Sequence, residues 1–225
     1  MDKIECSPWN NSSRGSGVHC QPRLRCLAPA LTTWIRLNGQ LAERWCEQDD
    51  CPWWYRERAL LGTFCGSLWR SDSDNVVLEE YSDSKTGRLT LKTYTGRVDL
   101  YFEVGNQRFV AESKHVWVAA TRRKSQSVKI RECIRQASGD IRRSKLDRRF
   151  RFRRLAMVFA SPYIRVNGKP PSSQDLKERA LWSVKQAQMT NPDAMAWTFP
   201  RLGRYGKYNG GICPGVIMLL KEVVR

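Results

Sequence analysis

Apolar side chains repeat at the spacing of an α-helix in two segments of the chain. In the first segment, residues 55–69, the repeating positions are Leu60, Leu61, Phe64, Cys65 and Leu68. In the second, residues 127–143, the apolar positions follow the pattern i, i+3, i+4, i+7 and i+11, namely Ile130, Cys133, Ile134, Ala137 and Ile141. A stripe of this kind faces a protein core and leaves the other side of the helix in water. Helices are therefore predicted in both segments, and weaker patterns indicate two more over 31–47 and 175–189.

Alternation of apolar and polar residues predicts a β-hairpin between the two clearest helices. In a strand over 97–104, one face would carry Val98, Leu100, Phe102 and Val104. Gly105-Asn106 is a two-residue turn signal that joins this strand to another over 108–118. Further strands are predicted over 76–81, 89–95, 155–160, 195–199 and 216–223. This order of elements is typical of an α/β protein with a mixed central β-sheet flanked by helices.

The first part of the chain has a different character. Residues 1–30 contain many Pro, Gly, Ser and Asn residues and little periodicity, so they are predicted to form an irregular arm. With the helix over 31–47, this arm would make an N-terminal extension covering 1–54, followed by one domain over 55–225. A length of 225 residues fits a single domain with such an extension.

The predicted hairpin fixes which side chains lie opposite each other. If Gly105 and Asn106 are the two loop residues, Asp99 lies directly opposite Glu112. Opposed side chains of an antiparallel pair have Cβ atoms about 5 Å apart on the same face. Lys114 lies two residues beyond Glu112 and projects from that face as well. The sequence therefore predicts two carboxylates and one ammonium group close together.

Such a group of side chains favours metal-dependent chemistry on phosphates. Two neighbouring carboxylates repel each other unless one is protonated or a cation lies between them. Mg²⁺ binds oxygen ligands and typically takes one or two protein carboxylates together with water and phosphate oxygens. A lysine beside the ion could orient or activate an attacking water, or stabilise charge on a phosphate. These are the components that phosphodiester hydrolysis requires.

The motif also resembles that of a known superfamily, the PD-(D/E)XK nucleases, whose core is the restriction-endonuclease-like fold. The resemblance rests on the stretch Arg97-Val98-Asp99 and Phe109-Val110-Ala111-Glu112-Ser113-Lys114, and on the order of elements over 57–160. It implies that Asp99 and Glu112 are metal ligands, that the Ser113 carbonyl is a third ligand, and that Lys114 is the catalytic lysine. The residue before the Asp is usually Pro in the family and is Val98 here.

The resemblance implies roles for two further residues. Many members carry a Glu on the first helix, where Glu57 falls, as a metal-binding and catalytic residue. Many also carry a Gln on the helix after the lysine, and Gln136 is the Gln within that predicted helix.

Simpler interpretations stand beside these roles. Asp99 and Glu112 could belong to the solvated face of an ordinary hairpin. Glu57 could be an acid that the dipole of its own helix favours in the first turn. Gln136 lies about 120° from the centre of its apolar stripe and could be a plain surface residue.

The charge distribution favours a nucleic acid as the partner. The net charge is +17, yet residues 1–54 hold six basic and six acidic side chains, so the excess lies in the remainder. A polyanion is the expected partner of such a surface, and the basic residues are too dispersed for one membrane-binding helix. The candidate phosphate contacts lie in two segments that flank the helix over 127–143, and they are Arg122, Arg123, Lys124, Arg142, Arg143, Lys145, Arg148, Arg149 and Arg151. A frayed, solvated helix end is the alternative explanation for the second segment.

The eight cysteines are expected to be reduced thiols of a cytoplasmic protein. The first residues lack the apolar region of a secretory signal, and no apolar run approaches the roughly 20 residues of a membrane span. Reduced, buried thiols are the default in that compartment. A structural zinc or iron–sulfur site at Cys20, Cys26, Cys46 and Cys51 is the alternative, although their spacing lacks the tight pairs of common zinc sites.

Taken together, these features predict a Mg²⁺-dependent endonuclease that hydrolyses DNA rather than RNA, with Mn²⁺ able to substitute. The alternative is a non-catalytic nucleic-acid-binding module on the same fold, working in a larger complex. The sequence leaves open whether the protein acts as a homodimer or in a larger nucleoprotein complex. Phage defence and mobile elements are settings that fit such an enzyme.

Overall fold

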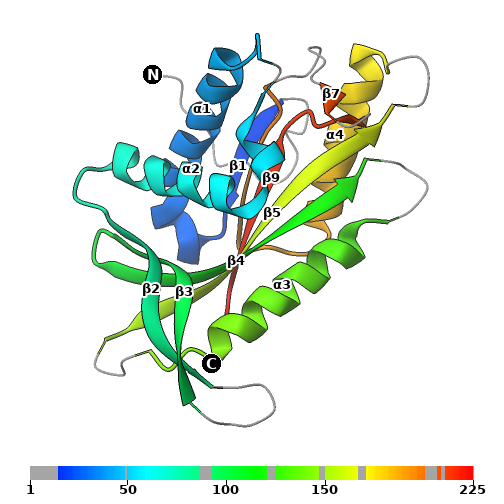
Figure 1. The fold of residues 1–225 in the computed structure, drawn as a ribbon. Coiled ribbons are helices and arrows are strands. Elements are labelled where there is room, and N and C mark those ends of the chain that lie inside the picture. Colours follow the sequence, from blue (N-terminus) through cyan, green and yellow to red (C-terminus); the bar gives the residue numbers. More distant parts are fainter. Residues whose placement is uncertain are drawn as a thin grey trace.

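The computed structural model describes residues 15–48, 50–86, 93–120, 125–146, 150–166, 171–200, 207–208 and 211–224. They form an α/β fold around a mixed β-sheet (Figure 1). Across the sheet, the strands follow the order β1 (Ser16–Cys20), β6 (Ala194–Thr198), β9 (Val216–Glu222), β5 (Phe152–Arg165), β4 (Gln107–Ala119), β3 (Thr93–Val104) and β2 (Val76–Thr86). Two short strands, β8 (Gly211–Ile212) and β7 (Lys207–Tyr208), extend from the end of β5. Only β4 and β5 are parallel; all other described pairs are antiparallel.

Helices cover both faces of this sheet. On one face lie α1 (Ala28–Arg44) and α2 (Arg56–Ser71), and on the other α3 (Ser127–Arg142) and α4 (Ser173–Gln188) (Figure 1). Strand β5 shows why both faces must be covered: Met157 packs with the α1 and α2 side, whereas its neighbour Val158 packs against α4, and both are fully buried. A strand that is buried on both faces has a continuous apolar sequence instead of an alternating one. The predicted mixed sheet flanked by helices is thus confirmed.

Residues 15–44 belong to this core. Strand β1 pairs with β6 at the edge of the sheet, and a 3-10 helix, η1 (Pro22–Leu27), leads into α1. Trp34 of α1 is fully buried, and its indole Nε1 donates a hydrogen bond to Thr63 Oγ1 of α2 at 3.0 Å. The prediction of an irregular arm is therefore wrong for residues 15–30, while residues 1–14 lie outside the described part. Strand β1 is only five residues long, too short for its alternation to stand out beside so many turn-forming residues.

The other predicted elements are present with shifted boundaries. The predicted strand over 89–95 is not a separate element where the structure describes it, because Thr93–Thr95 continue into β3, and 87–92 lie outside the described residues. A second short 3-10 helix, η2 (Pro52–Tyr55), precedes α2 and spans the proposed domain boundary at residue 54. None of the described helices has the length and apolar composition needed to cross a bilayer.

Strand β3 changes face at Asp99, which corrects the predicted alternation. Leu100 and Phe102 face α1 and α2 as expected, but Val98 belongs to the cluster on the α3 side, with Val110. In β2, the residue opposite Asp99 is Glu80, and its backbone has a positive φ of 52°. The pairing of β2 with β3 skips Glu80 and Asp99 and resumes in the same register on either side. Both strands are thus kinked at the same level, and the kink changes the direction of the side chains beyond it.

We expect Trp34→Ala to destabilise the whole protein by about 3–5 kcal/mol, since it removes a large buried side chain that joins α1, α2 and the sheet. The free energy of unfolding is to be measured by urea denaturation. Glu43→Ala, at an exposed position of the same helix, is the control and should change it little. An unaffected unfolding transition in Trp34→Ala would mean that residues 15–44 form a separate extension.

Candidate active site

The candidate site lies where β3 and β4 separate. Their pairing begins at Val104 and Gln107, as the Gly105-Asn106 turn predicts, and its last pair is Leu100 and Ala111. From there β4 continues beside β5 alone, up to Ala119. Among the described strands, none pairs with the β3-side edge of β4 from Glu112 onward. The predicted register is confirmed, and its next step brings Asp99 to the level of Glu112 at the point of separation.

The carboxylate of Asp99 replaces the hydrogen bond that a paired β3 would make to β4 at Ser113. Its Oδ2 accepts a hydrogen bond from the Ser113 backbone N–H at 2.7 Å and lies 3.1 Å from Ser113 Oγ. Glu57, in the first turn of α2, reaches the same hydroxyl, with its Oε1 at 2.9 Å from Ser113 Oγ. Burial raises the pKa of Glu57, while Ser113 and Lys114 act in the opposite direction. Glu57 is thus both a first-turn acid and a part of the site.

Glu112 is a buried carboxyl group. It is 4% exposed, so the alternative of a solvated hairpin face is wrong for this residue. Its Oε1 accepts a hydrogen bond from Lys85 Nζ, and the two groups form an ion pair. Burial, together with the negative charge of Asp99, raises the pKa of Glu112 to about 7, even though Lys85 and Lys114 favour the ionised form.

Lys114 is fixed between β4 and α3. Its Nζ donates a hydrogen bond to the Ser113 carbonyl oxygen at 2.8 Å and lies 3.2 Å from Asp140 Oδ2. Burial alone would lower the pKa of Lys114, but the hydrogen bond and charge of Asp140, with the charges of Glu57 and Asp99, raise it. Lys114 therefore carries a stable positive charge. Asp140 was not among the predicted site residues, and its only signal in the sequence is its position one helical turn beyond Gln136.

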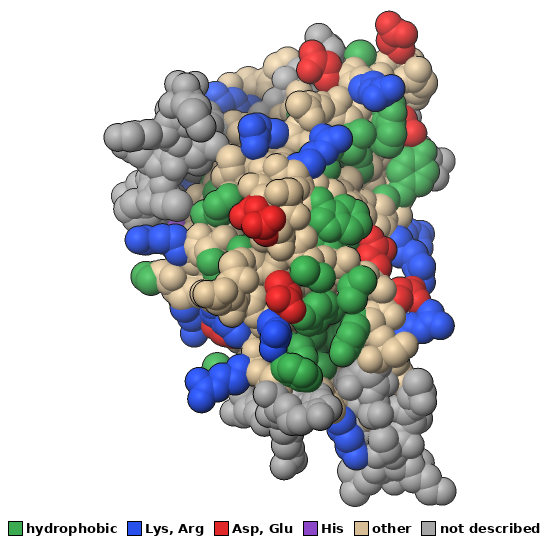
Figure 2. Space-filling view, turned by 90° about the vertical axis from the view of Figure 1, so that its left-hand side faces the viewer, with side chains coloured by type: hydrophobic (Ala, Val, Ile, Leu, Met, Phe, Trp, Pro, Cys, Tyr) green, Lys and Arg blue, Asp and Glu red, His purple; other side chains and the backbone are tan. Residues whose placement is uncertain are grey.

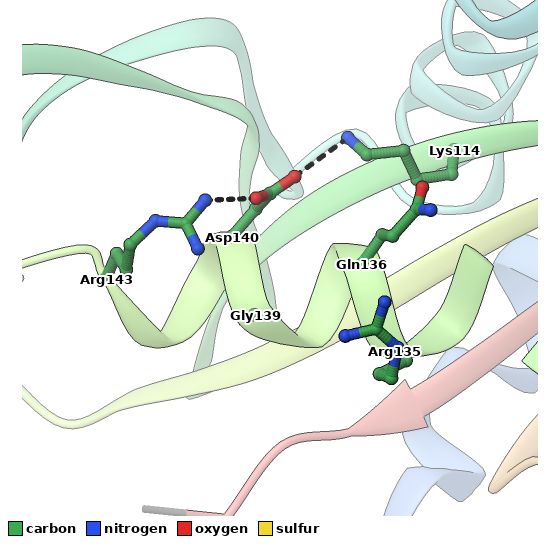
Figure 3. A pocket seen from close by; sticks show the side chains of 6 residues that line it. All are labelled: Lys114, Arg135, Gln136, Gly139, Asp140 and Arg143. Carbon is green, nitrogen blue, oxygen red and sulfur yellow. Dashed lines mark hydrogen bonds and ion pairs between the residues drawn. The ribbon is translucent and has the colours of Figure 1, made fainter. Parts of the chain in front are cut away.

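A pocket of about 500 Å³ adjoins Lys114 on the α3 side (Figure 3). It is lined by Lys114, Arg135, Gln136, Gly139, Asp140 and Arg143. Gln136 is half-buried, and its Nε2 donates a hydrogen bond to Glu132 Oε1 at 2.8 Å. The structure thus brings Gln136 to the same pocket as Lys114. Gln136 lies on the flank of α3, outside the apolar stripe, and this position directs its side chain toward β4.

The described residues offer oxygen ligands suited to Mg²⁺. Asp99, Glu112 and the Ser113 carbonyl lie together at the point of separation, and Glu112 already holds a cation, the Lys85 ammonium. Within the described ranges, no group of three or more His, Cys, Asp or Glu side chains is arranged to hold a metal ion. A magnesium ion here would rely on two carboxylates, a carbonyl and water, which is a usual set for this metal.

The alternative zinc or iron–sulfur site concerns four cysteines in the first part of the chain. Cys20, Cys26, Cys46 and Cys51 all lie within the described residues and form no such metal-binding group there. Cys20 and Cys51 are buried in the core beside α1 and α2, where small thiol side chains pack as apolar groups.

The predicted phosphate-binding residues divide into three sets. Arg142, Lys145 and Arg151 are exposed, whereas Arg143 forms an ion pair with Asp140. Outside the described residues lie Arg122, Arg123, Lys124, Arg148 and Arg149. Two arginines that follow Arg151, outside the predicted set, are structural: Arg153 pairs with Glu222, and Arg154 is buried, with its guanidinium on the Ser144 carbonyl.

Helix α3 adds three basic residues that were not among the predicted phosphate contacts, Lys129, Arg131 and Arg135. Its exposed side chains are Val128 and four cations, namely Lys129, Arg131, Arg135 and Arg142. They lie away from the apolar stripe, so the helical pattern could have identified them. By contrast, basic and acidic side chains are interspersed with apolar ones on the side of the molecule that carries α1 and α2 (Figure 2).

Comparison of the chain with protein-family models, curated proteins and solved structures finds no match.

We expect Glu112→Gln to alter how the stability of the metal-free protein depends on pH. The folded-state pKa of about 7 lies above the ordinary 4.5 of the unfolded chain. The folded protein therefore binds this proton more tightly, and the resulting stabilisation, complete below pH 4.5, is lost as the pH rises through 7. Gln does not titrate. The unfolding free energy of the variant minus that of the wild type should therefore increase by about 3 kcal/mol between about pH 4.5 and about pH 8.

Urea denaturation in EDTA at several pH values measures this difference. Glu43→Gln, at an exposed position of α1, is the matched substitution. If the stability curves of Glu112→Gln and the wild type ran parallel, Glu112 would not have a raised pKa.

Proposed function

We propose that this protein is a Mg²⁺-dependent endonuclease of the PD-(D/E)XK type that hydrolyses phosphodiester bonds of DNA. The observation that supports this most is the meeting of Asp99, Glu112 and Lys114 at the point where β3 and β4 separate. The order of elements around it agrees with the resemblance: α2, then β2 to β4, then α3 and β5.

The chain's own residues supply distinct parts of this reaction. Asp99, Glu112 and the Ser113 carbonyl would hold the ion, with Glu57 close by through the Ser113 hydroxyl. When bound, Mg²⁺ lowers the pKa of a coordinated water and stabilises negative charge on the phosphate. Lys114 would stabilise that charge further or orient the water. In the metal-free protein its pKa is raised, so it carries a positive charge and can donate hydrogen bonds.

Asp140 positions Lys114 for this role. Its carboxylate holds Nζ from the α3 side while the Ser113 carbonyl holds it from β4. The contact with Asp140 limits the freedom that Lys114 loses when substrate binds, which favours catalysis.

The basic face of α3 would bind the DNA backbone. It lies beside the pocket of Lys114, because Arg135 contributes to both. Contacts to phosphates do not depend on base sequence and position the duplex on the protein.

A second candidate function is a nucleic-acid-binding module without catalysis. The ion pair between Lys85 and Glu112 favours it, since a lysine occupies a carboxylate that the metal would need. The presence of Asp99, Glu112 and Lys114 together favours the enzyme.

We expect the purified protein to nick or linearise plasmid DNA with Mg²⁺ or Mn²⁺ and to be inactive in EDTA. Asp99→Asn, Glu112→Gln and Lys114→Ala should each lower the cleavage rate by about 100-fold or more, because each removes charge stabilisation from the reaction. Gel analysis of plasmid cleavage over time measures the rate. Lys185→Ala, at an exposed position on α4, is the control and should cleave like the wild type.

Circular dichroism and DNA-binding assays of Lys114→Ala should match those of the wild type. If the wild type and Lys114→Ala behaved alike on single-stranded DNA, duplex DNA and RNA with both metals, the binding module would replace the nuclease.

We expect the logarithm of DNA affinity to fall linearly with the logarithm of salt concentration. Replacing Arg131, Arg135 and Arg142 together by Gln should reduce this slope by up to about 3, since each phosphate contact contributes about 0.9. Fluorescence anisotropy with a labelled duplex in Ca²⁺ measures the slope at several salt concentrations.

The control removes the same number of charges from the other side of the molecule, at the exposed residues Arg25, Arg44 and Arg70. Equal slopes for the two triple variants would show that net charge, and not the α3 face, governs binding.

A further inference from the structure

Lys85 reaches the candidate site from β2, the edge strand of the sheet beyond β3. It lies near the end of β2, opposite Tyr94 of β3, and its backbone also bridges to Ser144, just after α3. Its ammonium group contacts Glu112 on β4, so the side chain extends past β3 to meet a strand that β2 does not pair with. The sequence did not predict this contact, because Lys85 and Glu112 are 27 positions apart in the chain.

Gly96 makes this path available. It belongs to β3, between Lys85 and Glu112, and a Cβ atom built on it would lie 2.8 Å from both Cγ and Cδ of Lys85. Any other residue at position 96 would therefore collide with the lysine stem. The glycine lets the stem lie directly against the backbone of β3.

The ion pair is largely removed from water. The side chain of Lys85 is 11% exposed and that of Glu112 is 5% exposed. Lysine seldom becomes this buried unless it is paired, and at the protein surface such a contact would contribute little. Lys85 is thus a fixed cation of the site and not a surface lysine that meets DNA.

We infer that Lys85 is the internal counter-ion of Glu112 and competes with the divalent metal ion for that carboxylate. The inference rests on the proposed function for the identity of the ion. Without metal, the ammonium compensates the charge of the Asp99 and Glu112 pair and keeps the site assembled. When the metal binds Glu112, its charge repels the ammonium and weakens or displaces that contact. Lys85 is therefore a positioning residue that sets the metal affinity.

The test is a titration of the 225-residue chain with Mn²⁺ in the absence of DNA, followed by isothermal calorimetry. Lys85→Met keeps the length of the stem and removes the competing charge, so it should bind Mn²⁺ at least about tenfold more tightly than the wild type. Lys85→Arg keeps the cation and should stay close to the wild type. Lys185→Met on α4 makes the same change of net charge at an exposed position and should also match the wild type.

Gly96→Ala provides an independent variant. It keeps the lysine and displaces its stem, so it should also tighten Mn²⁺ binding. Thermal unfolding of the metal-free proteins adds a second readout: Lys85→Met should have a lower melting temperature than the wild type without metal, and a larger rise when Mn²⁺ is added.

The outcomes separate this inference from the proposed function. If the wild type binds Mn²⁺ and Asp99→Asn does not, the metal site stands. In that case, if Lys85→Met bound Mn²⁺ no more tightly than the wild type, Lys85 would not compete with the metal ion, while the metal site itself would stand. If neither the wild type nor Lys85→Met binds Mn²⁺ at millimolar concentration, both the metal site and the inference are wrong.

Discussion

The separation of β3 from β4 is the constraint on which the candidate site depends. While two strands are paired, their backbone N–H and C=O groups form hydrogen bonds with each other, so these groups are not available to bind a side chain or a ligand. After Leu100 and Ala111 this pairing stops, and the Ser113 N–H needs another acceptor, which the carboxylate of Asp99 provides. The kink at Asp99 and Glu80 lets β3 turn away while β4 continues in register with β5. Backbone geometry thus places one acid beside another in a largely buried position.

Two lysines balance the negative charge of this position in different ways. Lys85 contacts the carboxylate of Glu112, whereas Lys114 contacts the Ser113 carbonyl and Asp140. One cation therefore lies where a metal ion would bind, and the other lies beside the pocket that faces α3. Two neighbouring acids, of which Glu112 is buried, require such compensation, and the fold supplies it from the strands on either side of β3.

The sequence predicted those parts of the site that local geometry determines. A two-residue turn fixes the register of a hairpin, so the positions of Asp99 and Glu112 followed from Gly105-Asn106. Helical periodicity likewise identified α2 and α3. The contacts of Lys85 and Asp140 depend instead on how separate elements pack, and no local pattern encodes them. Strand β1 was missed for the same reason, since only its pairing with β6 makes it a strand.

That pairing also has a consequence for how the chain folds. Strand β1 (Ser16–Cys20) is the first described strand to leave the ribosome, yet its partner β6 (Ala194–Thr198) is among the last. Contacts between such distant residues slow folding, because a long loop must close before they form. During synthesis the helices and the β3–β4 hairpin can form from local contacts, while β1 must wait. Completion of the sheet edge is therefore a late event, and the five-residue length of β1 limits the unpaired edge that it exposes meanwhile.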